Sequence, residues 1–355
     1  MIVLLEPVCT AWIHEEVNAG FLQLIMNNIS DEEVTYIGEK RHIRCIRKIY
    51  DNPQIHFIAL NRFIDFNAAD LYKNIFYYFR LLCSIIIRCK PEKLFVLCGY
   101  RPCILAVELI SILFRNVKMN LIVHGMIEEK KGHKESYAKL FKLGNFCKRL
   151  HFVSYSPYCT GDYWNIKEDK FVFLHHPYVK SSQYTLTSRK SNGSKIVIGI
   201  IGACANDKAI KLISLVNRKK PNNEYEFWVA SKFGRKFKKL ENVKILDLEF
   251  ERKNIEKIMC SMDYLLLPYG KDEYRLSASG VLWDAVSNRI PCLMLDSKYF
   301  EYYSPYRIGY RADSINELCK IICERIQERR RKDTFFVGMD QIVRENDKII
   351  RHLLR

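Results

Sequence analysis

The sequence contains no Cys-x-x-Cys pair, although it has 13 cysteines. An odd number of cysteines, scattered through apolar runs, does not suggest a disulfide framework. The missing pair also removes the usual spacing of a structural zinc site. We therefore expect reduced, buried thiols in a cytoplasmic protein, and no bound metal.

The sequence also lacks the run of about 20 apolar residues that a membrane-spanning helix needs. The best candidate, residues 75–87, is short and is interrupted by Arg80. The first residues, MIVLLEP, include no basic leader and reach Glu6 too early for a secretion signal. We expect a cytoplasmic protein, and peripheral contact with the inner face of the cytoplasmic membrane stays open.

Acidic residues are in the minority: there are 57 Lys and Arg against 40 Asp and Glu, which gives a formal net charge of +17. Such a surplus favours acidic partners, such as phosphorylated small molecules or anionic lipid, over a merely solubilising surface. Nucleic acid is not expected, because no recognisable nucleic-acid module occurs and the positive charge is spread along the chain.

Short apolar runs alternate with helical segments almost throughout the 355 residues, a length that favours two domains. Strand-like runs in the first half are 1–6, 33–38, 54–60, 93–99, 119–125, 149–155 and 170–176. After a polar, Ser- and Thr-rich stretch they recur at 195–202, 224–231, 242–248, 263–269 and 291–295. Strands that are apolar on both faces and separated by helices indicate parallel sheets covered on both sides.

The predicted fold class is therefore α/β, with two Rossmann-like doubly wound domains, a cleft between them and a C-terminal helix. The N-terminal domain is placed at residues 1–178, the linker at 179–194, the C-terminal domain at 195–338 and the final helix at 339–355. Packing of this helix back on the N-terminal domain is an option. Ligands of such sheets bind beyond the carboxyl ends of the strands.

Two segments of the C-terminal domain have the features of an anion site. In SASGVLWDAV, Ser277, Ser279 and Gly280 introduce a predicted helix, and its unpaired N–H groups favour a phosphate. A second helix is predicted at 209–216, after the strand KIVIGIIG and its loop. In that loop Gly202 allows close approach of the backbone, and Lys208 could neutralise a diphosphate. Each feature alone also fits an ordinary helix cap or a solvated lysine. Because both segments follow strands at the carboxyl edge of the predicted sheet, we favour an anion site over these ordinary explanations.

The second half resembles the donor-binding domain of GT-B glycosyltransferases. The likeness lies in a turn of small residues that includes glycine, an acidic helix residue followed by a small residue, and a proline before a strand. These residues are Ser279, Gly280, Asp284, Ala285 and Pro291. The segment GIIGACANDKAI is similar to that domain's opening strand and loop, whose lysine corresponds to Lys208. The likeness spans residues 195–300. In the first half it is one of architecture, together with His124 and the pair His176-Pro177.

The resemblance implies an acceptor-side N-terminal domain and a C-terminal domain that binds a nucleotide-sugar, which is a substrate and not a cofactor. The implied donor-binding residues are Gly202, Ala203, Lys208, Ser231, Arg275, Ser277, Ser279, Gly280 and Asp284. No metal is expected, because N–H groups with a lysine or arginine can stabilise the charge on a leaving diphosphate.

The candidate catalytic residues are His14, Glu15, His124 and Glu273. An imidazole or carboxylate at His14 or Glu15 could act as general base on an acceptor hydroxyl in an inverting enzyme; a polar first helical turn is the alternative. Retaining members of the family often have two glutamates, and the corresponding positions here are Leu276 and Asp284. Glu273 could supply the missing carboxylate, so retention or inversion stays open.

The sequence thus predicts a glycosyltransferase that moves a sugar from a nucleotide-sugar to a glycan or lipid-linked glycan acceptor. The expected context, from the resemblance and the charge, is bacterial polysaccharide biosynthesis, such as that of lipopolysaccharide or capsule. The aromatic and basic segment 71–90 and the linker are candidates for contact with an anionic membrane surface. Two alternatives stay open: a GT-B-fold UDP-sugar epimerase and a catalytically silent, nucleotide-binding partner of a glycosylation complex.

Overall fold

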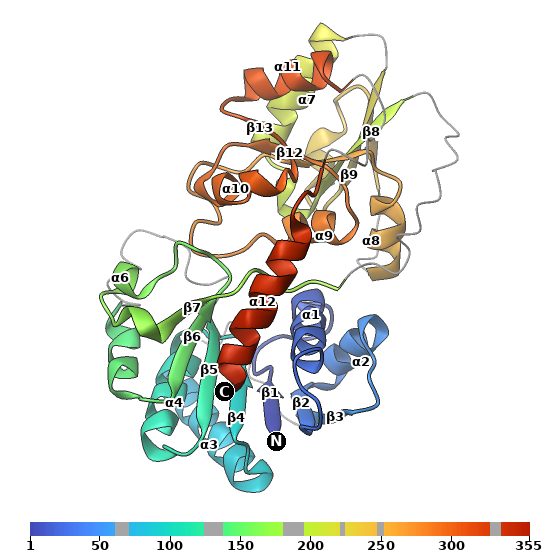
Figure 1. Ribbon diagram of the computed structural model, residues 1–355. Coiled ribbons are helices and arrows are strands. Elements are labelled where there is room, and N and C mark those ends of the chain that lie inside the picture. Colours follow the sequence, from blue (N-terminus) through green and yellow to red (C-terminus); the bar gives the residue numbers. More distant parts are fainter. Residues whose placement is uncertain (61–70, 124–137, 180–194, 221–223, 247–251, 327–334) are drawn as a thin grey trace. The chain divides into compact units, whose positions relative to one another are not determined.

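The computed structural model describes residues 1–60, 71–123, 138–179, 195–220, 224–246, 252–326 and 335–355. Its chain divides into two compact units (Figure 1). Unit 1 comprises Met1–Val179, Tyr274–Ala278 and Gln341–Arg355, and unit 2 comprises Lys180–Glu273 and Ser279–Asp340. The predicted linker lies outside the described residues, except for Val179.

Unit 1 is built on a parallel, seven-stranded sheet with the order β3-β2-β1-β4-β5-β6-β7. The strands are β1 (Ile2–Leu5), β2 (Val34–Glu39), β3 (Ile55–Leu60), β4 (Lys93–Val96), β5 (Lys118–Val123), β6 (Leu150–Ser154) and β7 (Phe171–Phe173). The strands predicted in the first half are therefore confirmed, some with shorter ends.

Helices cover both faces of this sheet, as alternating residues of β1 show. Val3 and Leu5 pack in one core with α3 and α4, whereas Ile2 and Leu4 pack in another with α1, α2 and α12. Because successive strand residues point to opposite faces, a strand that is apolar at every position is buried from both sides. The helices of unit 1 are α1 (Glu15–Met26), α2 (Lys40–Ile49), α3 (Leu71–Cys89), α4 (Arg101–Leu113), α6 (Gly161–Trp164) and α12 (Met339–Leu354).

The last helix packs on unit 1, so both chain termini lie in that unit (Figure 1). Leu353 of α12 is fully buried in the core that also holds α1. Two polar contacts add to this packing. Glu345 Oε2 lies 2.7 Å from His175 Nε2, and Asn28 Nδ2 donates to Asp347 Oδ1 at 2.7 Å.

Unit 2 contains a parallel, six-stranded sheet with the order β10-β9-β8-β11-β12-β13. Its strands are β8 (Ile196–Ile201), β9 (Tyr225–Ala230), β10 (Val243–Ile245), β11 (Tyr264–Leu267), β12 (Cys292–Leu295) and β13 (Gly309–Ala312). Its helices are α7 (Asp207–Lys219), α8 (Arg252–Met259), α9 (Gly280–Ser287), α10 (Lys298–Tyr302) and α11 (Ile315–Glu324). The five strands predicted here are confirmed, and β13 is a strand that the sequence did not predict.

The α/β class with two Rossmann-like, doubly wound domains is confirmed. In each unit the strand order reverses direction at one place, between β1 and β4 in unit 1 and between β8 and β11 in unit 2. Ligands of open α/β sheets bind beyond the carboxyl ends of the strands at such a switch point. The loops that follow these four strands are therefore the places to look for a site.

Candidate functional site

In unit 2 the switch point lies between the loops that follow β8 and β11. The chain leaves β8 through a 3₁₀ turn at Gly202–Cys204, and Asn206 then caps α7 by accepting from Lys208 N at 3.1 Å. The loop after β11 leads to α9, which Ser279 caps by accepting from Leu282 N at 3.2 Å. Both predicted helix beginnings are confirmed, and both lie at the carboxyl edge of the sheet.

Tyr269, two residues after the end of β11, connects the two loops. Its hydroxyl lies 2.8 Å from Ser279 Oγ and 3.4 Å from Cys204 Sγ, from which it accepts a hydrogen bond. Its ring stacks on Phe300, with 5.5 Å between the centroids. Because Tyr269, Ser279 and Cys204 are all buried, these contacts fix the beginning of α9 against the turn after β8. The sequence pattern placed Tyr269 at the end of a predicted buried strand, but it did not indicate that the Tyr269 hydroxyl connects the two loops.

Gly202 and Gly280 border open space on the two loops. A Cβ atom built on either residue would meet nothing within 4 Å, which is true of no other glycine in the described ranges. Gly202 also has a φ of +58°, a backbone conformation that favours glycine. Gly280 is exposed and is the first residue of α9. An anion can therefore approach backbone N–H groups at both places.

Lys208 places a positive charge beside these loops. The residue is half-buried on the first turn of α7, and its Nζ would lie 3.1 Å from a Cβ atom built on Gly270. Glu273 lies beside the same glycine, and its Oε2 accepts from Gly270 N. Within the described part of the chain, Lys208 Nζ has no hydrogen-bond or ion-pair partner. A partly desolvated ammonium of this kind is stabilised by a bound anion.

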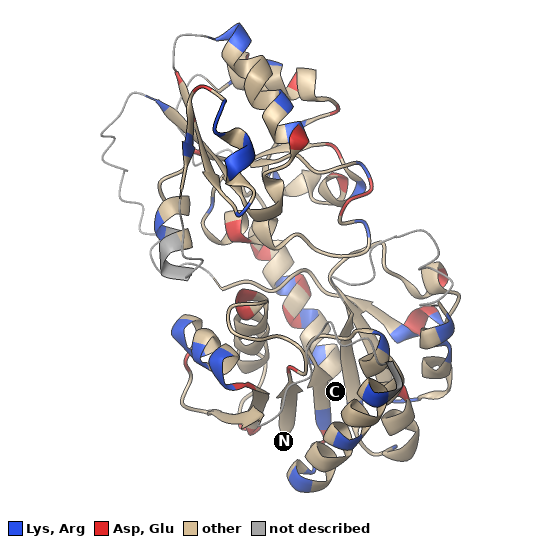
Figure 2. Ribbon diagram, turned by 180° about the vertical axis from the view of Figure 1, so that it is seen from behind, with Lys and Arg blue, Asp and Glu red and all other residues tan. Residues whose placement is uncertain are grey.

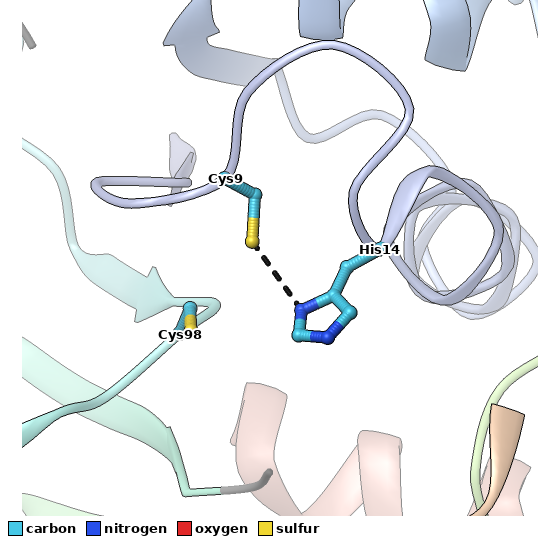
Figure 3. Close-up of side chains that lie close together, drawn as sticks. All are labelled: Cys9, His14 and Cys98. Carbon is cyan, nitrogen blue, oxygen red and sulfur yellow. Dashed lines mark hydrogen bonds between the residues drawn. The ribbon is translucent and has the colours of Figure 1, made fainter. Parts of the chain in front are cut away.

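In unit 1 the loops after β1 and β4 bring three side chains together (Figure 3). Cys9 follows β1, His14 immediately precedes α1, and Cys98 follows β4. Cys9 Sγ lies 3.3 Å from His14 Nδ1, and the two sulfur atoms and one ring nitrogen all lie within 4.8 Å of one another. Both cysteines are buried, whereas His14 is exposed.

The loop between β1 and α1 is organised around the buried carboxylate of Glu6. Its oxygens accept from Cys9 N and from Asn18 Nδ2, each at 2.9 Å. Ala11 and His14 both adopt left-handed backbone conformations, with φ of +48° and +56°. Such conformations cost about 1–3 kcal/mol each in residues other than glycine, and they cluster at functional sites. The fold thus holds this loop in a strained conformation.

The two thiols and the imidazole affect each other's pKa values. The hydrogen bond to Cys98, together with burial, raises the pKa of Cys9 well above its usual value. The same hydrogen bond lowers the pKa of Cys98, although burial opposes this. Desolvation by the surrounding protein atoms lowers the pKa of His14, but the hydrogen bond to Cys98 and the charges of Cys98 and Glu6 outweigh this effect and raise the pKa. Cys98 is therefore the thiol more easily deprotonated.

No protein-family model and no curated protein matches the sequence. Solved structures match it over its whole length. A UDP-forming trehalose-phosphate synthase from Burkholderia xenovorans has a TM-score of 0.66 at 10% identity and covers 100% of both chains. A glycosyltransferase from Rickettsia africae has a TM-score of 0.62 at 14% identity, over 99% of this chain and 92% of that chain. A UDP-GlcNAc 2-epimerase from Neisseria meningitidis has a TM-score of 0.60 at 14% identity, over 98% and 94%.

The fold is GT-B. At these identities the likeness establishes the fold alone, so residue roles depend on the geometry of this chain.

Seven of the nine donor-binding residues predicted from the GT-B resemblance lie at the carboxyl edge of unit 2: Gly202, Ala203, Lys208, Ser231, Ser279, Gly280 and Asp284. The structure gives two of their hydroxyls another role than the predicted one. Ser231 Oγ donates to Gly202 O at 2.7 Å, and Ser279 Oγ is fully buried between Leu282 N and Tyr269. Both hydroxyls hold the loops in place, and backbone N–H groups and Lys208 remain as exposed or half-exposed donors.

The other two predicted donor residues, Arg275 and Ser277, lie in unit 1. Between them Leu276 is buried in the core shared with α3 and α4. Ser156 Oγ donates to Arg275 O at 2.5 Å, and the Arg275 guanidinium lies 5.8 Å from the ring centroid of Tyr163. The chain thus returns to unit 1 for five residues, and Arg275 and Ser277 do not share a unit with Ser279.

Of the predicted catalytic residues, His14 has an exposed side chain at the carboxyl edge of unit 1. Glu15 is buried next to Cys45. Burial of the Cys45 thiol, together with the charge and the hydrogen bond of Glu15, raises the pKa of Cys45 to about 11. Glu273 is exposed in unit 2. His124 lies outside the described residues.

Proposed function

We propose that this chain is a nucleotide-sugar-dependent glycosyltransferase whose unit 2 binds the donor. The main support is one arrangement: the open glycines Gly202 and Gly280 lie on loops connected by Tyr269. Beside them is the ammonium of Lys208, to which the described residues offer no hydrogen-bond or ion-pair partner. During glycosyl transfer the leaving nucleoside diphosphate gains negative charge, and preorganised N–H groups with a lysine stabilise it. Such a site needs no metal at the diphosphate.

Asp284 is the proposed contact for hydroxyl groups of the ribose or the donor sugar. The residue is half-buried and lies one helical turn after Gly280, on the same face of α9. A carboxylate there can accept hydrogen bonds from sugar hydroxyls while the N–H groups at the beginning of the helix bind phosphate.

His14 is the proposed general base in unit 1. It would take the proton from an acceptor hydroxyl while that oxygen bonds to the anomeric carbon and the nucleoside diphosphate leaves, which inverts the configuration. Its imidazole is exposed, and a pKa raised above the usual value suits a base that works near neutral pH.

The proposed acceptor is a glycan or lipid-linked glycan at an anionic membrane surface, in bacterial polysaccharide biosynthesis. The net charge of +17 and the Lys and Arg residues on helices of both units support this (Figure 2). Helix α3 exposes Lys73, Phe76, Arg80 and Ile87 at the spacing of one helix face. Apolar and basic side chains on one face suit binding to an anionic bilayer surface. Among the described helices, none has the length and hydrophobicity that a membrane-spanning segment requires.

A UDP-sugar epimerase is the second candidate, because a UDP-GlcNAc 2-epimerase whose structure contains UDP-GlcNAc has the same fold over 98% of this chain. An epimerase would change the donor sugar without any acceptor, whereas a transferase would need the acceptor or would slowly hydrolyse the donor.

The test is a thermal-shift screen of the full chain against UDP-, GDP-, dTDP- and CMP-linked sugars. NMR of the stabilising nucleotide-sugar, with and without candidate acceptors, should then follow. Transfer or slow release of the nucleoside diphosphate supports the transferase, and a new sugar epimer without acceptor supports the epimerase. Binding without turnover indicates a silent partner of a glycosylation complex. No stabilisation by any of the four classes contradicts the proposal.

A further inference from the structure

The three side chains Cys9, His14 and Cys98 form a cluster that the proposed transfer reaction does not require as a whole. They come from two loops at the switch point of unit 1, because β1 and β4 are adjacent in the sheet (Figure 3). Two thiols and an imidazole are the ligand types that Zn²⁺ and similar thiophilic cations prefer.

The spacing of the cluster matches a tetrahedral centre. With Zn–S and Zn–N bonds of the usual lengths, neighbouring ligand atoms are about 3.5–3.8 Å apart. In unit 1 the Cys9 Sγ to His14 Nδ1 distance is 3.3 Å, and all three ligand atoms lie within 4.8 Å of one another. Small rotations of the side chains would therefore suffice to enclose one ion.

The electrostatics around the cluster also favour a cation. Glu6 is fully buried, and its carboxylate accepts from Val8 N, Cys9 N and Asn18 Nδ2. Among the described residues no lysine or arginine pairs with Glu6. Buried carboxylates are ordinarily balanced by a positive charge. Because Glu6 fixes the backbone of Cys9, it would act as a supporting residue that orients one ligand.

We propose that Cys9, His14 and Cys98 bind one thiophilic divalent cation of the Zn²⁺ class in unit 1. The two thiols release their protons on binding, and His14 coordinates through Nδ1. Because His14 is exposed, the fourth position is open to water or to another ligand from solvent. An imidazole bound to the cation cannot act as a general base, so this ion would inhibit the proposed transfer.

The test uses the full, reduced chain titrated with Co²⁺ in the absence of any substrate, so that its outcome does not depend on the proposed function. We expect one Co²⁺ per chain, thiolate-to-cobalt charge-transfer absorption, and visible bands of a tetrahedral site, all displaced by Zn²⁺. Cys9→Ser and Cys98→Ser should each weaken the charge-transfer band and the affinity at least tenfold. The matched control is Cys103→Ser, because Cys103 is a buried thiol of α4 outside the cluster.

Circular dichroism of every variant checks folding, and the wild-type titration remains decisive if a serine variant unfolds. Absence of the charge-transfer band in the wild-type chain would overturn the proposal. The same holds for a band of equal intensity in Cys9→Ser, Cys98→Ser and Cys103→Ser.

Discussion

At the scale of single residues, the donor site of unit 2 depends on the charge of Lys208. Lys208→Ala should weaken binding of the nucleotide-sugar about tenfold to a hundredfold, because a hydrogen bond to a charged group contributes about 1.5–3 kcal/mol. Isothermal titration calorimetry measures this. Lys211→Ala is the matched control, because Lys211 is an exposed lysine of the same helix. Equal affinity of the two variants would remove Lys208 from the site.

A buried carboxyl group in unit 1 predicts a dependence of stability on pH. Glu108 of α4 is fully buried, and burial raises its pKa to about 8, although a hydrogen bond from Gly144 N opposes this. A raised pKa means that the folded chain holds the proton to higher pH than the unfolded chain does. This contribution to stability is fully present below about pH 4.5 and is lost as the pH rises towards 8, at up to about 1.4 kcal/mol per pH unit.

Glu108→Gln should therefore flatten the fall in the free energy of unfolding between about pH 5 and pH 8, because glutamine cannot ionise and can still accept from Gly144 N. Urea unfolding at several pH values, monitored for unit 1, is the measurement. The exposed Glu33 supplies the control, since Glu33→Gln should leave the wild-type profile unchanged. A profile of Glu108→Gln that is as steep as wild type would contradict the assignment.

At the scale of elements, the N-cap of α9 connects stability with ligand binding. Ser279→Ala should lower the free energy of unfolding by about 1–3 kcal/mol, because it removes the cap and one partner of the buried Tyr269 hydroxyl. It should also weaken nucleotide binding, since the beginning of α9 would no longer be fixed. Urea unfolding and calorimetry test the two effects. Ser261→Ala is the control, because Ser261 is only half-buried and its hydroxyl makes a single exposed hydrogen bond to Lys257 O. No loss of stability relative to that control would contradict the capping role.

The exposed face of α3 gives a prediction about membranes. The Arg80 guanidinium lies 5.7 Å from the ring centroid of Phe76, and both side chains are exposed. Arg80→Glu should reduce co-sedimentation with phosphatidylglycerol vesicles about tenfold, because each cation near an anionic surface contributes about 1 kcal/mol. Arg218→Glu makes the same change of charge on α7 of unit 2. If both variants lose binding equally, net charge and not α3 accounts for the contact.

At the scale of the whole molecule, the proposed donor contacts and the proposed base belong to different units, so their effects should separate. His14→Ala should lower the transfer rate by a factor on the order of 10²–10⁴. It should leave the dissociation constant of the nucleotide-sugar unchanged, because the proposed donor residues lie in unit 2. Single-turnover kinetics and calorimetry on the same preparation measure both. A parallel loss of donor affinity would show that His14 supports binding and not proton transfer.

The sequence by itself determined most of the secondary structure and both helix beginnings of the candidate site. Apolar runs and capping residues act over a few residues, so β8, β11 and the caps Asn206 and Ser279 can be recognised locally. Strand β13 was missed because it is short, includes Gly309 and is only partly buried. Gly309 is needed there for close approach, since a Cβ atom on it would lie 1.9 Å from Cys292 O.

Only the tertiary structure decided which loops meet. Leu276 is as apolar as any core residue, and nothing local indicates that it packs in unit 1. Its packing there places Arg275 and Ser277, on the loop that leads to Ser279, in unit 1. In the same way the contact between the Cys9 and Cys98 loops follows from the adjacency of β1 and β4. The apolar pattern of a segment indicates whether that segment is buried. The order of the strands determines which distant segments pack against each other, and this order depends on the packing of the whole unit.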